Sequence, residues 1–498
     1  MISRLLNKNT RHPLNTLQFV SLLYLGIPIV LFFVSWLKWY YALCLIILIL
    51  APFLNFSIEF SRKGIRKFFT YFLVVGLFLI LQGYGEILPQ SGDWGKHNAI
   101  LSQLFNHGNQ PVYIPYKGVD HILCYGLGFY MVPVFLAGIF KSYMMMKWLI
   151  LLNSAIGLTL VGFWANRIWK TPLWAIILVF LLGSLDWIKD LKWFLINYES
   201  GWDIFYTIGN LQILSTIDQT PQHGIPTFLV FVIILDQLFT ETPMYLLCLY
   251  ILVIGFFWSP FLIFALLPLM VLIKINDLQA QINLPLLLIT IPILAVGYFL
   301  VCYYQMHIPV GKATLDIPGL KWMIYEFITR YTWIYGIPLA FIFIINWKLH
   351  FIRTIEIKLI ASFLFISIIY KQVNYGFFND FEGKTTYLIL FILYIYMLKG
   401  TILYFSSFNL VSKVAVCFFV FICSFMSLKV IWMKILAFGS ETYFERFDCN
   451  VHLLSTKPNI KLENALEKAT EVHNYPFIIQ YLGEMNTVSS EIFKPVKR

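Results

Sequence analysis

Long apolar segments separated by short polar links make up most of the chain between residues 17 and 433. The apolar runs are roughly 15 to 22 residues long, about the length that crosses the hydrocarbon core of a bilayer as a helix. We count about 13 to 14 such runs, each continuous rather than alternating between apolar and polar positions. The pattern predicts an all-α, polytopic transmembrane helix bundle followed by a small polar tail.

The runs divide the chain into three parts. Residues 1–67 contain two N-terminal transmembrane helices, residues 68–432 form the main transmembrane domain, and residues 433–498 form the tail. The first run, from Leu17 to Trp36, is too long for the core of a signal peptide and lacks a small-residue cleavage site, so we expect a retained helix.

The distribution of lysine and arginine among the loops predicts which side of the membrane each loop faces. The densest basic cluster, Arg62 to Lys67, should be cytoplasmic, and Lys141 and Lys147 are expected on the same side. Counting membrane helices forward from the N-terminus places the polar stretch at 186–223 inside. Counting backward from the basic link at Lys348 to Lys358, taken as inside, places it outside. We favour the extracytoplasmic side, because two lysines in almost forty residues are few for a cytoplasmic loop. One crossing between Leu123 and Leu185 is then miscounted.

The amino-acid composition indicates a membrane protein and argues against several other classes. The 498 residues are 59% hydrophobic and 12% charged, and the mean hydropathy is +0.76. The net charge of +11 is explained by cytoplasmic loops and does not indicate nucleic acid. The seven cysteines form no CxxC pair, so neither a zinc site nor a disulfide framework is indicated, and no glycine-rich phosphate loop occurs.

The polar run at 91–98 is the first candidate for chemistry. Asp93, Lys96 and His97 place an acid, a cation and a base within five residues, at the expected edge of the bilayer. If residues 98–105 continue as a helix, Ile100, Leu101 and Leu104 form an apolar stripe along the membrane surface. Such a group suits a lipid-linked phosphate substrate. The alternatives are a hydrated loop, or an Asp93 that merely caps the helix.

Two further polar loops are expected on the same side. Candidate binding residues lie in three places: Asp120 and His121; Gln222 and His223; and Asn379, Asp380 and Lys384. Ionisable groups near a bilayer are costly unless solvated, paired or functional, so their convergence on one face favours a site. The alternative is that they are solvated loop residues, or, for Gln222 and His223, a helix cap.

With these residues in view, the chain resembles the bacterial polytopic glycosyltransferases of the GT-C superfamily. Gly92-Asp93-Trp94 with His97 is similar to the loop in which an acidic residue of that superfamily acts on polyprenyl-phosphate substrates. Pro221-Gln-His223 and Asn379-Asp-Phe381 resemble segments of multi-pass proteins grouped with these enzymes. The relatives commonly have arginine after the Asn-Asp pair, where this chain has Lys384, a point charge rather than a planar fork.

The resemblance implies an integral-membrane glycosyltransferase. It would move a sugar from a polyprenyl-phosphate donor to an acceptor glycan, lipid or protein, with inversion, on the extracytoplasmic side of the bacterial inner membrane. Asp93 would be the catalytic base. The substrate-binding residues would be Lys96, His97, Asp120, His121, Gln222, His223, Asn379, Asp380 and Lys384. No protein metal site is expected, and a divalent cation with the donor phosphate is left open. The alternatives are a polyprenyl-linked glycan ligase or polymerase, and a lipid flippase or transporter.

Overall fold

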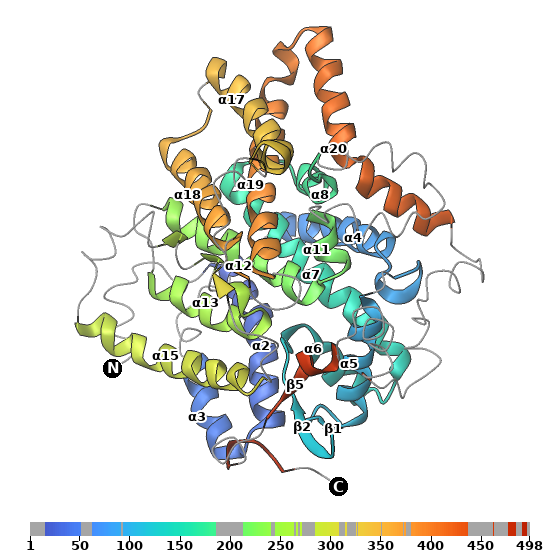
Figure 1. The fold of residues 1–498 in the computed structure, drawn as a ribbon, viewed down its shortest axis with the longest axis vertical. Helices are drawn as coiled ribbons and strands as arrows, with labels where there is room; N and C mark the ends of the chain where they lie inside the picture. The colour runs from blue at the N-terminus through green and yellow to red at the C-terminus, as the bar shows by residue number, and fades with distance from the viewer. Residues whose placement is uncertain are drawn as a thin grey trace.

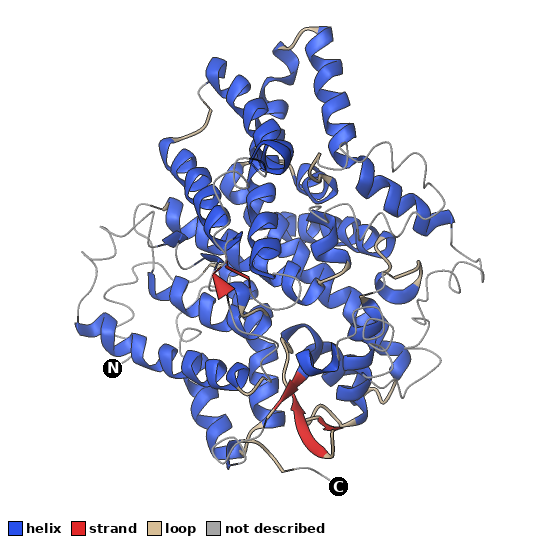
Figure 2. Cartoon of the chain, viewed as in Figure 1, coloured by secondary structure: helices blue, strands red, loops and turns tan. Residues whose placement is uncertain are grey.

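The computed structural model is a bundle of helices with a few short strands (Figures 1 and 2). It describes residues 15–50, 62–90, 93–185, 213–240, 245–262, 265–266, 269–270, 284–307, 314–315, 325, 327–349, 351–371, 373–374, 380–436, 462, 477–484 and 491–495. Within these ranges, six helices are long and apolar enough to cross a membrane. The predicted all-α class and the membrane character are therefore confirmed at this coarse level.

The long helices agree with the apolar runs. In chain order the described helices are α2 (Thr16–Trp36), α3 (Trp39–Leu50), α4 (Arg62–Leu81), α5 (Trp94–Asn106), α6 (Gly128–Ile139), α7 (Tyr143–Trp169), α8 (Leu173–Leu181), α11 (Ile213–Asp218), α12 (Pro221–Phe239), α13 (Tyr245–Trp258), α15 (Leu284–Gln305), α17 (Ile337–Leu349), α18 (Thr354–Lys371), α19 (Asp380–Tyr404) and α20 (Leu410–Leu436), with a π-helix at Phe327–Gly336 and short 3-10 turns at Tyr84–Glu86, Phe405–Ser407 and Phe477–Tyr481.

Local sequence explains where several of these helices begin and end. Asn15 and Gln18 form a capping box, because each side chain accepts a hydrogen bond from the other's backbone N–H at 3.0 Å. Pro221 opens α12, where its missing N–H costs nothing. Helix α13 ends at Trp258, just before Ser259 and Pro260, since proline disfavours a helical residue ahead of it.

Helix α12 defines two ends of the bundle. Its 19 residues span about 28 Å, close to the thickness of a hydrocarbon core. Near its last turn, Arg167 of α7 pairs with Asp236 at 3.0 Å, and Arg353 lies over the Phe239 ring. At its other end, Ser215 donates a hydrogen bond to Tyr387 near the start of α19. We call the first the basic end and the second the polar end.

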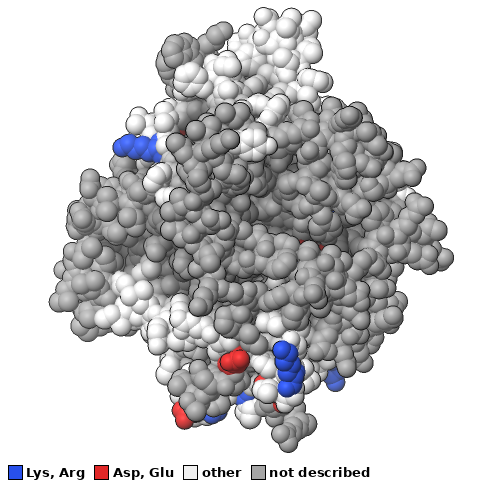
Figure 3. All heavy atoms as spheres, in the orientation of Figure 1, with Lys and Arg blue, Asp and Glu red and all other residues white. Residues whose placement is uncertain are grey.

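Several elements meet at the polar end. The starts of α5 and α19 and the last turn of α20 contact α11 there, through Trp94, Tyr387 and Lys434. Figure 3 shows one face, where most of the visible described charges lie near the lower edge of the view. Which end faces the cytoplasm stays a prediction.

One predicted crossing is corrected. The apolar run at 122–140 contains the end of a strand and then α6, whose 12 residues extend only about 18 Å. The first turns of α7 pack at the polar end, because Trp148 and Leu151 lie beside Gly85, and the neighbouring Tyr84 bonds the carbonyl of Ile217 in α11. Lys141 and Lys147 were expected with the basic cluster and are instead at the opposite end of the bundle. Without a crossing at 122–140, the forward and backward counts of membrane helices place residues 186–223 on the same side.

A small antiparallel sheet lies beside the bundle. Strand β1 (Tyr113–Tyr116) pairs with β2 (Val119–Leu123), and β2 pairs with β5 (Leu482–Gly483) from the tail. Tyr113 bonds the carbonyl of Lys494, and Phe493 packs on Trp36. A second pair joins β3 (Thr314–Leu315) to β4 (Val373–Asn374). These strands, and the attachment of the described tail residues to the bundle, were not predicted.

Candidate functional site

Asp93 and Lys96 form the exposed part of the candidate site. The Lys96 ammonium lies 3.0 Å from Asp93 Oδ2, with side-chain exposures of 17% and 33% respectively. Burial is the largest single effect and lowers the pKa of Lys96, but the Asp93 carboxylate together with Tyr481 and Tyr125 raises it well above its ordinary value. Asp93 stands at the N-cap position of α5, yet its side chain makes no capping hydrogen bond. The structure therefore does not support the alternative that Asp93 is a simple helix cap.

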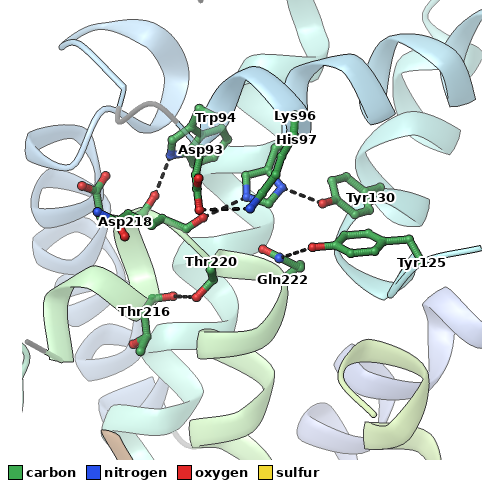
Figure 4. A network of polar contacts seen from close by, with 11 residues as sticks. Asp93, Trp94, Lys96, His97, Tyr125, Tyr130, Thr216, Asp218, Thr220 and Gln222 are labelled. Carbon is green, nitrogen blue, oxygen red and sulfur yellow. Dashed lines mark hydrogen bonds and ion pairs between the residues drawn. The ribbon is translucent and has the colours of Figure 1, made fainter. Parts of the chain in front are cut away.

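His97 links three elements beneath this pair (Figure 4). Its Nε2 lies 2.9 Å from the carbonyl oxygen of Gln219, and its Nδ1 lies 2.7 Å from the Tyr130 hydroxyl. A carbonyl only accepts, so Nε2 carries the proton, and in the neutral ring Nδ1 accepts from Tyr130. The ring is fully buried. In this arrangement His97 joins α5 to α6 and to the start of α12, and its predicted contact with substrate stays a prediction.

Trp94 connects the site to a buried ion pair. Its indole N–H donates to the carbonyl of Asp218 at 2.7 Å. The Asp218 carboxylate accepts from Lys434 at 2.7 Å, and that ammonium also donates to the carbonyl of Gln82 at 2.9 Å. Burial raises the pKa of the Asp218 carboxyl above its ordinary value; Lys434 opposes this and Asp93 adds to it. The ends of α4 and α20 are thereby fixed to α5 and α11.

Tyr125 forms the opposite wall. Its hydroxyl accepts a hydrogen bond from the Gln222 side chain at 2.7 Å (Figure 4), and its ring lies 6.1 Å from His223. The Tyr481 ring, from the tail, is 4.9 Å from Tyr125. Cys124 N–H bonds the Tyr481 carbonyl at 2.8 Å, which holds the tail segment in place. Gln222 and His223 therefore lie at the polar end near the Asp93 loop, as predicted.

A narrow, partly open crevice with room for little more than a water molecule lies between the starts of α12 and α19. Its polar lining includes Thr216, Thr220, His223, Thr227 and Tyr387. The Thr216 and Thr220 hydroxyls already donate to the carbonyls of Ile213 and Thr216, so the crevice by itself does not indicate a ligand site.

Other predicted residues lie elsewhere or are not described. Asp120 is exposed on β2, and His121 Nδ1 lies 2.9 Å from the carbonyl of Val119, in the same strand. Asn379 is outside the described residues. Asp380 and Lys384 belong to the first turns of α19, and only their backbone is described. Their predicted roles stay predictions.

The apolar stripe of α5 corrects one expectation. Ile100, Leu101 and Leu104 are fully buried against the protein, so this face does not lie along a membrane surface. Five polar residues of the site were not predicted from the sequence: Tyr125, Tyr130, Asp218, Lys434 and Tyr481. A lysine within the apolar run of α20 was a signal that could have identified Lys434.

Within the described part of the chain, no group of three or more His, Cys, Asp or Glu residues is arranged to hold a metal ion. The site can instead supply a carboxylate, an ammonium and several hydroxyls to a bound molecule. Comparison with known proteins found no matching family model, no matching curated protein and no matching solved structure.

Proposed function

We propose that the protein is a membrane-embedded glycosyltransferase that takes its sugar from a polyprenyl-phosphate donor. The observation that carries the proposal is the Asp93–Lys96 pair, in which a partly exposed carboxylate and a cation lie 3.0 Å apart at the polar end of an apolar bundle. A lipid-linked phosphate needs both features, since its tail stays among apolar helices while its reacting end lies at the polar boundary.

The chemistry follows from the two charged groups. Asp93 would take the proton of the acceptor hydroxyl as that oxygen forms its bond to the anomeric carbon of the sugar. The bond from that carbon to the phosphate oxygen would break, and polyprenyl phosphate would leave with both bonding electrons. Lys96 would stabilise the negative charge that grows on the phosphate. Direct displacement inverts the anomeric centre.

The buried network supports this role by fixing the position of α5. His97 and Trp94, on either side of Gly95 and Lys96, are held by Tyr130, Gln219 and Asp218. Both anchors are completely buried, so the first turn of α5 is held in place while Asp93 and Lys96 stay partly exposed. Preorganised charges of this kind need little rearrangement during the reaction.

A flippase or transporter is the second candidate, and one observation favours it. Ionisable residues inside membrane helices often mark transport paths, and Lys434 and Asp236 both lie in membrane-length helices. Each is within the last turns of its helix rather than near the middle, where transporters usually bind their substrates.

The test is a turnover assay with purified protein and a panel of polyprenyl-phosphate sugars, measuring released polyprenyl phosphate. Asp93→Asn should fold normally and lower turnover by roughly 10² to 10⁴, the range for loss of a general base. Glu491→Gln is a matched control, since that carboxylate is exposed in the tail and has no role in the site. Parental turnover by folded Asp93→Asn protein would refute the base assignment. No release from any donor, together with lipid translocation in vesicles, would favour the flippase.

A further inference from the structure

A cationic surface runs along the basic end of the bundle, far from the candidate site. We call it the α4–α7 basic edge, and it consists of Arg62, Lys63, Arg66, Lys67, Arg167 and Lys170. The two helices pack side by side, with the Lys67 ammonium 5.7 Å from the centre of the Phe163 ring, one turn before Arg167. Residues from two segments about one hundred positions apart therefore form one surface.

Acidic groups within the described residues compensate only part of this charge. Arg167 pairs with Asp236 at 3.0 Å, and Asp236 also interacts with Lys170. The first turn of α4 contains no acidic residue, although it contains Arg62 and Lys63. Cations at a helix N-terminus oppose the helix dipole, so these side chains do not serve the stability of α4 itself. An anion bound outside the helix would neutralise the uncompensated positive charge and remove its unfavourable interaction with the helix dipole.

The surface next to these cations is apolar. Ile65, Phe69, Leu73 and Leu77 recur every four residues on α4, and all four are exposed. They form a stripe about 18 Å long that begins where the cations are. Cations at the start of α4, followed by an apolar stripe along the helix, match a lipid with an anionic headgroup and acyl chains. Inorganic phosphate would contact only the cations.

We propose that the α4–α7 basic edge binds anionic phospholipid, with the headgroup at the arginines and lysines and an acyl chain along the exposed stripe of α4. The inference does not depend on the proposed glycosyltransferase activity. It identifies the basic end as the end that contacts an anionic leaflet, and it gives α4, the least buried of the six long helices, a bound lipid on its open face.

The experiment uses the full chain in phosphatidylcholine nanodiscs and in mixed discs containing phosphatidylglycerol. Native mass spectrometry counts the bound lipids after mild detergent release, and lipid titration gives apparent affinity. Phosphatidylglycerol should bind in preference to phosphatidylcholine, and the preference should weaken at high salt. Arg62→Gln/Lys63→Gln should lower its affinity by roughly fivefold per cation removed, or about 25-fold in total. This variant retains Arg66 and Lys67, and so keeps the charge that orients the helix.

The matched control is Lys117→Gln/Lys141→Gln, which removes two exposed lysines from the polar end. It should leave phosphatidylglycerol affinity unchanged. If Arg62→Gln/Lys63→Gln is not recovered folded, Lys67→Gln should give a single fivefold loss. Equal binding of the two lipids, an equal loss in the control, or full competition by millimolar inorganic phosphate would overturn the proposal.

Discussion

Removing the Lys434 ammonium should be the most destabilising single change at the polar end. The pair between Lys434 and Asp218 spans 2.7 Å, with side-chain exposures of 0% and 1%. Lys434→Met keeps most of the apolar stem but leaves the Asp218 carboxylate buried without its cation. Breaking a buried pair in this way costs about 3 to 5 kcal/mol. At roughly 2 °C per kcal/mol, the melting temperature should fall by about 6 to 10 °C.

The stability lost in Lys434→Met should depend on pH. Burial raises the pKa of Asp218, so the folded protein holds this proton at pH values where the unfolded chain has released it. An acid whose pKa is raised by folding destabilises the protein as the pH rises through the interval between its unfolded and folded pKa values. Without Lys434 that interval widens. The stability lost in Lys434→Met should therefore be partly recovered on acidification from pH 8 to pH 5.

Thermal unfolding in detergent, followed by tryptophan fluorescence, measures both effects. Lys358→Met is the control, because that lysine is exposed on α18, and it should change stability by less than about 0.5 kcal/mol. Combining Lys434→Met with Asp218→Leu should restore much of the stability, since the double variant leaves no uncompensated charge. A Lys434→Met protein as stable as the parent, or a double variant that loses the sum of both single losses, would refute the argument.

Two further predictions follow from the fold. Single cysteines at Lys117 and Lys358 should label from opposite sides of the membrane with an impermeant thiol reagent in intact cells and inverted vesicles, and labelling from one side would contradict the two-ended arrangement. Phe493→Ala removes a ring packed on Trp36 and should loosen the tail, so that buried Cys124 alkylates faster in a variant retaining only that cysteine. Phe421→Ala, an exposed phenylalanine, should leave the alkylation rate unchanged.

The parts of the fold that depend on local hydropathy could be predicted from the sequence. The apolar run from Leu17 to Trp36 predicted a helix, and α2 is found at Thr16–Trp36, because a span length of apolar residues is a local property. The short α6 was mistaken for a full span, since an apolar strand end directly precedes it and the two together have the length of a crossing.

The side-chain partners within the site were predicted only where the residues are neighbours in sequence, and Gln222 and His223 were grouped with them only by the expected side of the membrane. Asp93, Lys96 and His97 were found together because they occupy one turn of α5. The partners that hold them are separated by long stretches of chain: 33 residues to Tyr130, and 216 between Asp218 and Lys434. Apolarity does not specify which helices are neighbours, so a lysine in α20 could be noticed in the sequence but not assigned to its aspartate.

The tail strand has a consequence for how the protein matures on the ribosome. Tyr113 of β1 and Lys494 of the tail, which are joined by a hydrogen bond, are separated by 381 residues. At about 5 to 20 residues per second, roughly 20 to 75 s of translation pass between them. During that time nearly every membrane helix is inserted while β2 and Tyr125 still lack Tyr481. A nascent chain in transit through the membrane would thus lack the Tyr481 ring beside Tyr125, and the polar end would be completed only in the last stage of synthesis.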